Sequence, residues 1–256
     1  MSNLFARPTH FTAIDSTNRY LIDRARLGDP EGGVAIADSQ SDGRGRLGRS
    51  WASVPHSSLL CSMLFRPSLE IEDFHLVMTI VALSARDAID ELAGVEVSLK
   101  WPNDLLVDEA KVAGLLAEIV ETDLGHALIV GIGINIQWPG DEAPSELAPS
   151  ESGAATRATT LYEASGQLVD RDLLAQSMLE NISCDYRLLG DRSFHLELMQ
   201  RYRDALGTIG RRVRVEQRGR SYEAEAIGVT DAGRLQVQEG GVVRELDAAD
   251  VIHLRH

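Results

Sequence analysis

The chain has 256 residues, of which 44% are hydrophobic, and this size suits one large domain with a small appendage. Its formal net charge of −14 argues against general nucleic-acid binding, because contacts with phosphate need a basic surface. No apolar run is long enough for a membrane span, and the first twenty residues lack the apolar core of a signal peptide. Two cysteines, Cys61 and Cys184, show no metal or redox spacing, so we expect a cytoplasmic protein without membrane or nucleic-acid partners.

The first half of the chain carries strand and helix patterns in alternation. Ser16 or Thr17 is suited to cap a helix that runs to Arg26. Apolar residues at helical spacing predict a second helix over residues 74–92. Short apolar runs predict strands over residues 33–38, 58–65, 95–101, 110–120 and 127–136, with a turn at Pro102-Asn103-Asp104 between the third and fourth.

The second half begins with a Pro-, Ser- and acid-rich stretch, residues 138–156, which predicts a surface loop. Thr160-Leu-Tyr-Glu163 has the form of a capping box, and further helices are expected over residues 172–189 and 194–206. After Gly207, alternating residues broken by glycines predict five short strands, the pattern of a small β-barrel.

The most unusual segment is Gly-Arg-Gly-Arg-Leu-Gly-Arg-Ser-Trp at residues 43–51. Glycine permits close backbone approach, and guanidinium groups bind phosphate or carboxylate with two parallel hydrogen bonds. A solvated flexible turn is the alternative interpretation. Because three further unusual strings follow, we predict a lid over a small bound anion, with an acidic patch on a protein partner as the other candidate.

Those strings are Lys100-Trp-Pro-Asn-Asp104, Lys111-Val-Ala-Gly114 and Gly131-Ile-Gly-Ile-Asn135. Each has an ordinary structural interpretation: Pro-Asn-Asp is good turn chemistry, and a lone lysine at a strand end is usually solvated. The third string lacks the last glycine and the following helix of a dinucleotide fingerprint, which excludes a Rossmann site. The sequence also lacks a P-loop, a zinc-ligand cluster and a serine-hydrolase motif.

Taken in order, with Ser16-Thr17-Asn18 and Gln40 ahead of them, these strings resemble those of biotin protein ligases from about residue 12 to the C-terminus. One departure is Leu47, where a basic or polar residue is common. The resemblance implies an α+β fold: a central mixed β-sheet flanked by helices, as in class II aminoacyl-tRNA synthetases and biotin synthetases, and a small C-terminal SH3-like β-barrel. The implied domains are a catalytic domain of residues 1–206 and a C-terminal SH3-like domain of residues 207–256.

The resemblance also implies the reaction. Biotin and ATP, with Mg²⁺, give biotinyl-5′-AMP and pyrophosphate, and a lysine of a biotin carboxyl carrier protein or domain, such as that of acetyl-CoA carboxylase, then takes the biotinyl group and releases AMP. Some members carry an N-terminal DNA-binding segment that represses biotin-synthesis genes. About ten residues precede the first motif here, so we expect a monofunctional ligase without operator binding, and a homodimer is a further expectation.

Carried over residue by residue, the resemblance assigns three groups. The expected catalytic residues are Lys111, Arg46 and Asp104, with Lys111 bridging biotin's carboxylate and the α-phosphate, and Asp104 steering the carrier lysine or a metal. The expected biotin-binding residues are Ser16, Thr17, Asn18, Gln40, Gly43, Arg44, Lys111, Gly114, Leu116, Gly131 and Gly133. The expected ATP and adenylate residues are Arg46, Arg49, Trp51, Asn103, Lys111 and Asn135.

Two other functions remain open at this point. Lipoate–protein ligase shares the same acyl-adenylate chemistry and would bind a different acid. A non-catalytic biotin sensor or transcriptional regulator would bind biotin without consuming ATP.

Overall fold

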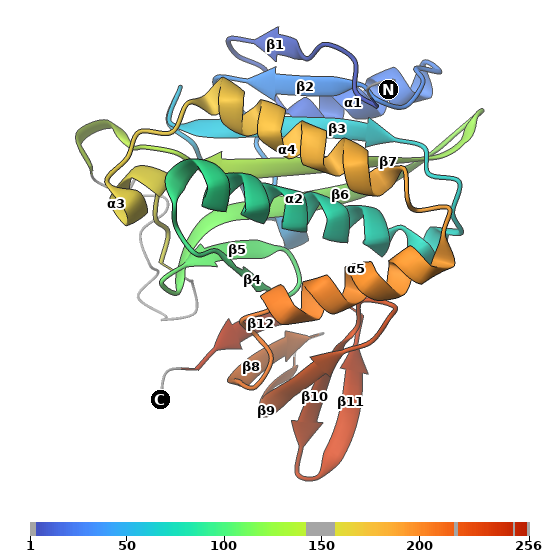
Figure 1. The fold of residues 1–256 in the computed structure, drawn as a ribbon, viewed down its shortest axis with the longest axis vertical. Helices are drawn as coiled ribbons and strands as arrows, with labels where there is room; N and C mark the ends of the chain where they lie inside the picture. The colour runs from blue at the N-terminus through green and yellow to red at the C-terminus, as the bar shows by residue number, and fades with distance from the viewer. Residues whose placement is uncertain (1–3, 142–156, 218–219, 248, 255–256) are drawn as a thin grey trace.

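The computed structural model describes residues 4–141, 157–217, 220–247 and 249–254. It contains a seven-stranded mixed sheet covered by helices and a separate five-stranded antiparallel sheet at the C-terminal end (Figure 1).

The large sheet has the order β1-β2-β3-β7-β6-β5-β4. Strands β1 and β2 pair in parallel, whereas the other neighbours pair antiparallel, which makes the sheet mixed. Its strands are β1 (Thr9–Phe11), β2 (Val34–Ala37), β3 (Ser58–Phe65), β4 (Ser98–Lys100), β5 (Asp104–Val107), β6 (Ala110–Thr122) and β7 (Gly125–Asn135).

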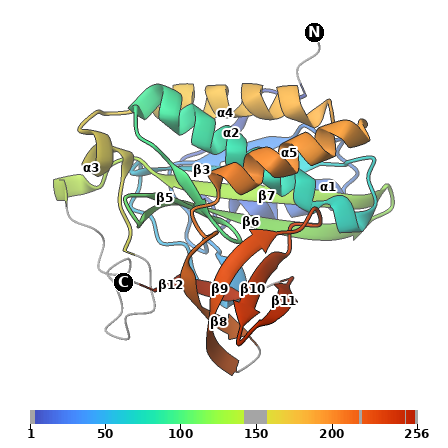
Figure 2. The ribbon, with the colours of Figure 1, turned by 60° about the horizontal axis from the view of Figure 1, so that its bottom comes forward.

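Helices cover both faces of this sheet. On one face lie α2 (His75–Ala93), α4 (Arg171–Tyr186) and α5 (Arg192–Ala205) (Figures 1 and 2). On the other face α1 (Thr17–Arg26) packs Leu21 against Leu64 of β3. Strand β3 is therefore buried along its whole length, and its side chains divide between the two faces as strand geometry requires. The short α3 (Leu161–Ser165) follows the chain segment that returns to the sheet at residue 157.

The small sheet has the order β11-β10-β9-β8-β12. Its strands are β8 (Arg212–Gln217), β9 (Arg220–Val229), β10 (Leu235–Glu239), β11 (Val242–Leu246) and β12 (Asp250–His253). Alternate residues such as Val213, Val215 and Val237 are fully buried, so each strand contributes one face to a common core.

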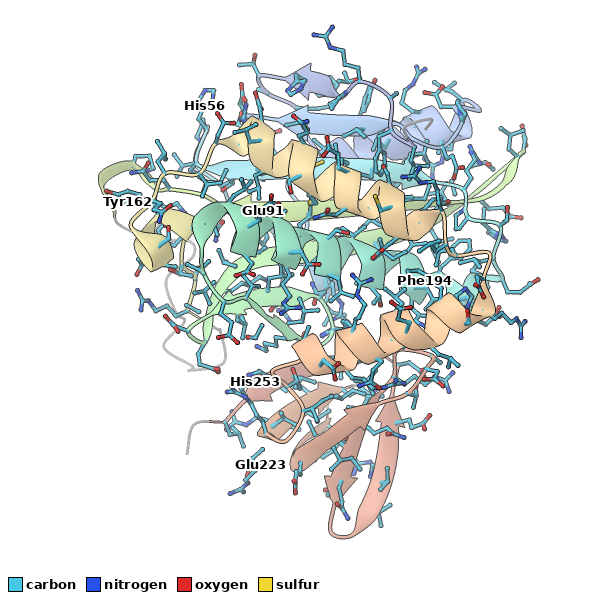
Figure 3. All side chains as sticks on the ribbon, viewed as in Figure 1. His56, Glu91, Tyr162, Phe194, Glu223 and His253 are labelled. Atoms are coloured by element: carbon cyan, nitrogen blue, oxygen red, sulfur yellow. The ribbon has the colours of Figure 1, made fainter. Side chains whose placement is uncertain are left out.

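Polar contacts join the small sheet to the region around β4. The Trp101 backbone N–H donates to Thr208 Oγ1 at 3.0 Å, and Thr208 Oγ1 lies 3.1 Å from Nε2 of His253, the residue labelled in Figure 3. Arg211 forms two 2.6 Å hydrogen bonds with the Glu109 carboxylate. Burial is the main reason that the pKa of His253 falls to about 4, so this histidine is neutral at pH 7.

Most of the predicted elements are confirmed. Ser16 caps α1, the Thr160 hydroxyl accepts from the Glu163 backbone N–H at the start of α3, and five strands follow Gly207. Sequence analysis missed β1 and β5, which have three and four residues, too few to show a period. Asp104, expected in a turn, is the first residue of β5, and most of the predicted 138–156 loop falls outside the described residues.

Within the described part of the chain, no helix combines the length and apolar character needed to cross a bilayer.

Candidate functional site

One cavity of about 500 Å³ lies between the α1-bearing face of the large sheet, the arginine loop (residues 43–51) and the C-terminal sheet. Every predicted site residue except Gly43 lines it. The predicted residues brought together here are Ser16, Thr17, Asn18, Gln40, Arg44, Arg46, Arg49, Trp51, Asn103, Asp104, Lys111, Gly114, Leu116, Gly131, Gly133 and Asn135.

A row of paired residues across five strands forms the floor of this cavity. Leu60 of β3 pairs with Gly133 of β7, which pairs with Gly114 of β6. Gly114 pairs in turn with Asp104 of β5, and Asp104 pairs with Lys100 of β4. Paired residues in a sheet point to the same face, so the two glycines leave a hollow between a leucine on one side and two charged groups on the other.

The next row, Ser62–Gly131–Leu116, supports a cluster of neutral polar groups that we call the amide end. The Ser62 hydroxyl donates to Asn18 Oδ1 at 2.6 Å and lies 2.7 Å from Thr17 Oγ1. Gln40 Oε1 accepts from the Thr17 backbone N–H at 2.7 Å and from the Thr17 hydroxyl at 2.9 Å. These three hydroxyl and amide groups of Thr17, Asn18 and Ser62 are all buried.

Glycine is required at position 131 by the amide end itself. A Cβ atom on Gly131 would lie 2.2 Å from Asn18 Oδ1, closer than atoms can pack, and 3.2 Å from Ser62 Oγ, which is a tight contact. Asn18 cannot withdraw freely, because its Nδ2 donates to the Glu118 carboxylate at 2.7 Å. The network therefore lies directly on the strand backbone.

The arginine loop folds back on itself rather than extending into solvent. The Trp51 backbone N–H donates to the Gly43 carbonyl at 2.8 Å, and the Gly45 N–H donates to the Arg49 carbonyl at 2.7 Å. Gly43 thus lies at the base of the loop and is not among the residues that line the cavity, so its predicted place among the biotin-binding residues stays a prediction. Glycine suits this position because a Cβ would lie 2.5 Å from the Trp51 carbonyl oxygen. Leu47, at the loop tip, is exposed and has a left-handed φ of 57°.

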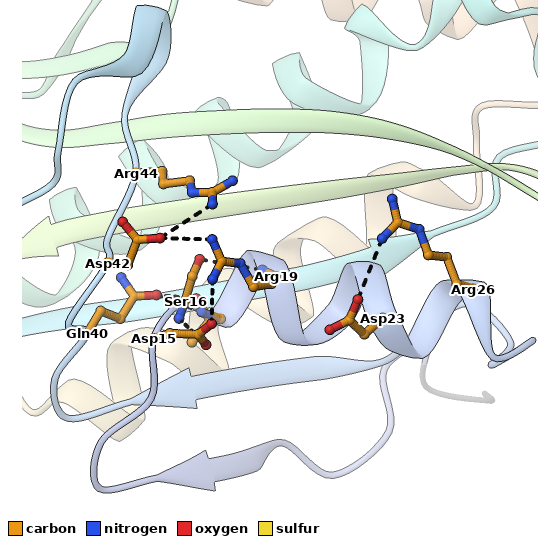
Figure 4. Close-up of polar contacts among 9 residues, drawn as sticks. Asp15, Ser16, Arg19, Asp23, Arg26, Gln40, Asp42 and Arg44 are labelled. Atoms are coloured by element: carbon orange, nitrogen blue, oxygen red, sulfur yellow. Dashed lines mark hydrogen bonds and ion pairs between the residues drawn. The ribbon is translucent and has the colours of Figure 1, made fainter.

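Each of the arginines around the cavity, and Lys111, is held by a polar group of the chain; Arg46, Arg49 and Lys111 form what we call the cationic end. Arg44 pairs with Asp42 at 3.4 Å, and Figure 4 shows Asp42 between Arg44 and Arg19. Lys111 Nζ lies 2.6 Å from Asp104 Oδ1.

The two remaining arginines reach other segments of the chain. Arg46 donates to Asn103 Oδ1 at 3.3 Å, and burial lowers the pKa of its guanidinium. Arg49 forms an ion pair with Asp250 of β12, which connects the arginine loop to the C-terminal sheet.

The cavity contains both lysines of the chain, Lys100 and Lys111, whereas all the other basic side chains apart from histidine are arginines. Lys100 is only 7% exposed, and burial lowers its pKa while the nearby Asp104 carboxylate opposes that shift. A lysine is a compact cation on a flexible stem, which suits contact with two different anionic groups.

Trp51 fills the hollow over the two glycines of the floor. A Cβ on Gly133 would lie 2.5 Å from the indole ring, and one on Gly114 would lie 3.0 Å from it. Lys111 Nζ lies 5.4 Å from the centre of the ring, within range of a cation–π interaction. The indole Nε1–H is buried and has no hydrogen-bond partner among the described residues.

Asn135 ends β7 beside the segment that returns at residue 157. Its Nδ2 donates to the Thr159 carbonyl at 3.1 Å, and its Oδ1 is buried without a partner in the part of the chain that the structure describes. The same segment binds the backbone of Lys111 on both sides, through the Arg157 carbonyl and the Thr159 N–H. The position of Lys111 is thereby fixed at its backbone while its side chain remains 27% exposed.

Sequence analysis missed several lining residues, among them Ser62 and a group from the C-terminal sheet. Ser62 could have been found, because a serine inside the otherwise apolar run of β3 needs a polar partner when buried. The C-terminal residues carried no recognisable signal, since their place at the cavity depends on how the small sheet docks; they are Glu216, Asp250, Val251 and Ile252.

Comparison with known proteins agrees with this geometry. Residues 10–135 match the biotin/lipoate A/B protein ligase family, and residues 208–254 match the biotin protein ligase C-terminal domain. The biotin–[acetyl-CoA-carboxylase] ligase of Mycobacterium tuberculosis is 33% identical over 246 residues, which cover 94% of this chain and 86% of that protein. The bifunctional ligase/repressor BirA of Bacillus subtilis is 31% identical over 93% of this chain and 71% of its own length.

A solved structure agrees as well. The biotin protein ligase of Aquifex aeolicus in complex with biotin and ATP superposes with a TM-score of 0.82 at 29% identity, covering 98% of this chain and all of that one. The matches extend over the catalytic sheet and the C-terminal sheet alike. The chain belongs to the biotin protein ligase family.

Proposed function

We propose that this cavity activates biotin with ATP and transfers the biotinyl group to a lysine of a biotin carboxyl carrier domain. The observation that carries the proposal is the joining, in one cavity, of a neutral amide end with a cationic end built from Arg46, Arg49 and Lys111. Biotin has a neutral ring that both donates and accepts hydrogen bonds and a carboxylate at the end of an apolar chain. The two ends of the cavity match the two ends of that molecule.

In this arrangement the biotin ring binds at the amide end, near Ser16, Thr17, Asn18 and Gln40. The glycines of the floor and Leu116 line the path of its chain, and its carboxylate reaches Lys111. Arg44, held by Asp42 beside the amide end, closes this part of the cavity. Gly43 acts only through the loop backbone.

The first step joins two anions, so it depends on fixed positive charge. A carboxylate oxygen of biotin attacks the α-phosphorus of ATP, and the bond from that phosphorus to the pyrophosphate oxygen breaks. Lys111 contacts both reacting groups and becomes more strongly bound as charge develops between them. Arg46 and Arg49 bind phosphate oxygens. The ion pair between Lys111 and Asp104 breaks when Lys111 binds the reacting carboxylate and phosphate groups.

In the second step the amine of the acceptor lysine attacks the carbonyl carbon of biotinyl-5′-AMP. The carbon–oxygen bond to the phosphate breaks, AMP leaves, and the proton lost by the amine passes to solvent water. Asp104, freed from Lys111, is positioned to take part in orienting that amine. The nucleoside of the adenylate binds on the side of Trp51, Asn103 and Asn135. There the Trp51 indole N–H and the Asn135 amide oxygen have no hydrogen-bond partner among the described residues.

Mg²⁺ fits this site as a companion of ATP. Within the described ranges no group of three or more histidine, cysteine, aspartate or glutamate side chains is arranged to hold a metal ion. Magnesium in ATP-dependent enzymes is usually held by phosphates and waters with one or two carboxylates, so no dedicated protein cage is needed. When bound, it supplies charge neutralisation at the phosphate oxygens.

Three further points belong to the same proposal. The catalytic unit is residues 1–206 and the C-terminal unit is residues 207–256, supported by the two separate sheets. The enzyme is cytoplasmic, where its ATP and acceptor would be found, and its two cysteines are free thiols. A homodimer is expected from the family.

Mass spectrometry of the acceptor tests the proposal directly. Incubation with ATP, Mg²⁺, biotin and a biotin carboxyl carrier domain should add one biotinyl group to the acceptor. Omission of ATP, or replacement of biotin by lipoate, should leave the acceptor mass unchanged. Lipoylation in place of biotinylation, or biotin-dependent binding without ATP–pyrophosphate exchange, would contradict the proposal.

A further inference from the structure

The backbone of Lys111 is bound by residues 157–160, a segment that lies far from it in the sequence. The Lys111 N–H donates to the Arg157 carbonyl at 2.6 Å, and the Thr159 N–H donates to the Lys111 carbonyl at 2.9 Å. The pairing of β6 with β7 begins two residues after Lys111, at Ala113. Segment 157–160 therefore takes the place of β7 beside this lysine.

The side chain of Glu163 holds this segment. Its carboxylate accepts from the Thr159 hydroxyl at 3.0 Å and forms an ion pair with Arg157. Its backbone N–H donates to Thr160 Oγ1 at 3.0 Å, the bond that caps α3. Glu163 thus binds the same two residues, Arg157 and Thr159, that bind the Lys111 backbone.

The short helix that carries Glu163 is itself fixed to the large sheet. Leu161 is fully buried, and the Tyr162 N–H donates to the Ile136 carbonyl at 2.9 Å, just beyond the end of β7. A movement of α3 would break these contacts, so the Glu163 backbone has a defined position next to the segment.

The two side-chain contacts of Glu163 differ in their surroundings. Thr159 is only 4% exposed, whereas the ion pair lies at the surface, with the Arg157 side chain 62% exposed and the Glu163 side chain 40% exposed. Exposed ion pairs contribute little to stability, while a hydrogen bond from a buried hydroxyl is costly to lose. The bond from the Thr159 hydroxyl is therefore the main link.

The segment also reaches the other side of the cavity. Asn135 Nδ2 donates to the Thr159 carbonyl at 3.1 Å, so Thr159 contacts both Asn135 and Lys111. Because the Lys111 side chain is long and partly exposed, the position of its backbone decides which atoms Nζ can reach. A misplacement of about 1 Å at a group that contacts the reacting atoms can cost on the order of a hundredfold in rate.

We propose that Glu163 is a positioning residue for Lys111: it holds segment 157–160 against β6 and so fixes the point from which the Lys111 side chain reaches the reacting groups. Glu163 itself lies outside the lining of the cavity, whereas Ala158 is part of it. The inference rests on the proposed function, because it takes from there the role of Lys111 in adenylate formation.

Kinetics of biotin-dependent ATP–pyrophosphate exchange by the full chain test this. Glu163→Ala removes both side-chain contacts, so kcat should fall about tenfold while the KM for biotin stays within about twofold, since the amide end is untouched. Glu163→Gln keeps an oxygen that accepts from the Thr159 hydroxyl and loses only the exposed ion pair. Most of the rate should therefore return in this variant.

The Lys111→Ala background separates positioning from a general loosening of the fold. There Glu163→Ala should lower kcat by less than about twofold, because the side chain that Glu163 positions is already absent. An equal loss of kcat in both backgrounds would overturn the inference, as would a wild-type kcat in folded Glu163→Ala. If Glu163→Ala does not fold, Thr159→Val removes the same hydrogen bond from its other partner, and a wild-type kcat in that variant would overturn the inference.

Ser165→Ala is the matched control on the same helix, because the Ser165 hydroxyl donates to the Leu161 carbonyl at 2.7 Å and does not contact segment 157–160. It should leave kcat unchanged. Hydrogen–deuterium exchange of the Lys111 amide, expected to be faster in Glu163→Ala, is a readout that needs no catalysis. An unchanged amide rate would overturn the inference, whereas a faster amide rate in a protein whose wild type shows no ATP–pyrophosphate exchange would overturn the proposed function.

Discussion

The two ends of the cavity hold their polar groups in opposite ways. At the amide end, Thr17, Asn18 and Ser62 are each at most 5% exposed, neutral and bonded to one another. At the cationic end, the Arg49 side chain is 61% exposed and the Lys111 side chain is 27% exposed, and both are paired with carboxylates of the chain.

The difference shows how one cavity can treat its two substrates differently. Buried neutral groups that bond to one another keep their places before any ligand arrives, so recognition there depends on an exact match of donors and acceptors. The Arg49–Asp250 pair, whose arginine side chain is 61% exposed, is of the weak and easily exchanged kind, so phosphate oxygens of a ligand can replace Asp250 at little cost. The Lys111–Asp104 pair is less exposed, at 27% and 19%, so a ligand anion has to replace the Asp104 carboxylate charge for charge.

The largest effect on activity is expected at Lys111, whose carboxylate partner is replaced by the reacting groups of the ligands. Lys111→Ala should lower biotin-dependent ATP–pyrophosphate exchange on the order of a hundredfold or more, because a charge that stabilises the transition state is lost. Folding should be nearly normal, since the side chain is partly exposed, and circular dichroism checks this. Exchange at the wild-type rate would remove Lys111 from the chemistry.

The amide end should be sensitive to steric change rather than to charge. Gly131→Ala places a methyl group against Asn18 and Ser62, so we expect the KM for biotin to rise about tenfold, with about 1–3 kcal/mol of lost stability. The KM for ATP should change much less. Gly190→Ala, at a position where a Cβ meets open space and the backbone is not left-handed, serves as the control for adding a methyl group to a glycine. A larger rise in the KM for ATP than for biotin would contradict the assignment of the two ends.

Acid should weaken the attachment of the C-terminal sheet on which the cationic end depends. The folded pKa of His253 is about 4, below the usual 6.5, so the unfolded chain binds a proton that the folded chain does not. This contribution to stability is complete above pH 6.5 and is lost as the pH falls from 6.5 towards 4.

We expect the wild-type protein to lose roughly 1–2 kcal/mol more than His253→Gln between pH 7 and 4.5, as measured by chemical unfolding at each pH. The comparison removes the acid effects that both proteins share. Parallel stability profiles would show that His253 does not titrate with unfolding.

The smallest effect is expected at Asp250. Asp250→Asn removes the carboxylate that competes with phosphate for Arg49, so the KM for ATP should fall about threefold while the KM for biotin stays constant. Raising the salt concentration should reduce the difference between the two proteins, because exposed pairs are screened. A higher KM for ATP in Asp250→Asn would mean that Asp250 positions Arg49 usefully instead of competing with ligand.

The sequence predicts most of the large sheet and the motif residues, because both produce recognisable patterns in short stretches of sequence. The 8-residue β3 and the 19-residue α2 show clear apolar patterns, and the strings at Lys100, Lys111 and Gly131 stand out by composition. What it could not reach depends on three-dimensional pairing. Asp250 and Arg49 form an ion pair although they are 201 positions apart in the chain, and no sequence pattern near either residue predicts the contact.

The same limit applies to the roles of individual residues. The motif places Gly43 among the biotin-binding residues but gives no sign that its carbonyl closes the loop by accepting from the Trp51 N–H. Ser62 was overlooked although it bonds to two residues that were correctly placed at the cavity. Register between β3 and β7 places Ser62 beside Gly131, and the closure of the arginine loop places Gly43; neither can be taken from a single string of residues.

The restriction of lysine to the cavity has a consequence for the chemistry of the product. Biotinyl-5′-AMP acylates primary amines, and the guanidinium groups that supply the remaining strong positive charge are poor nucleophiles because they stay protonated. Of the two lysines, Lys100 is buried and Lys111 is engaged with Asp104. An escaped molecule of this activated anhydride would thus find no lysine on the outer surface of the enzyme, which protects the catalyst from labelling itself.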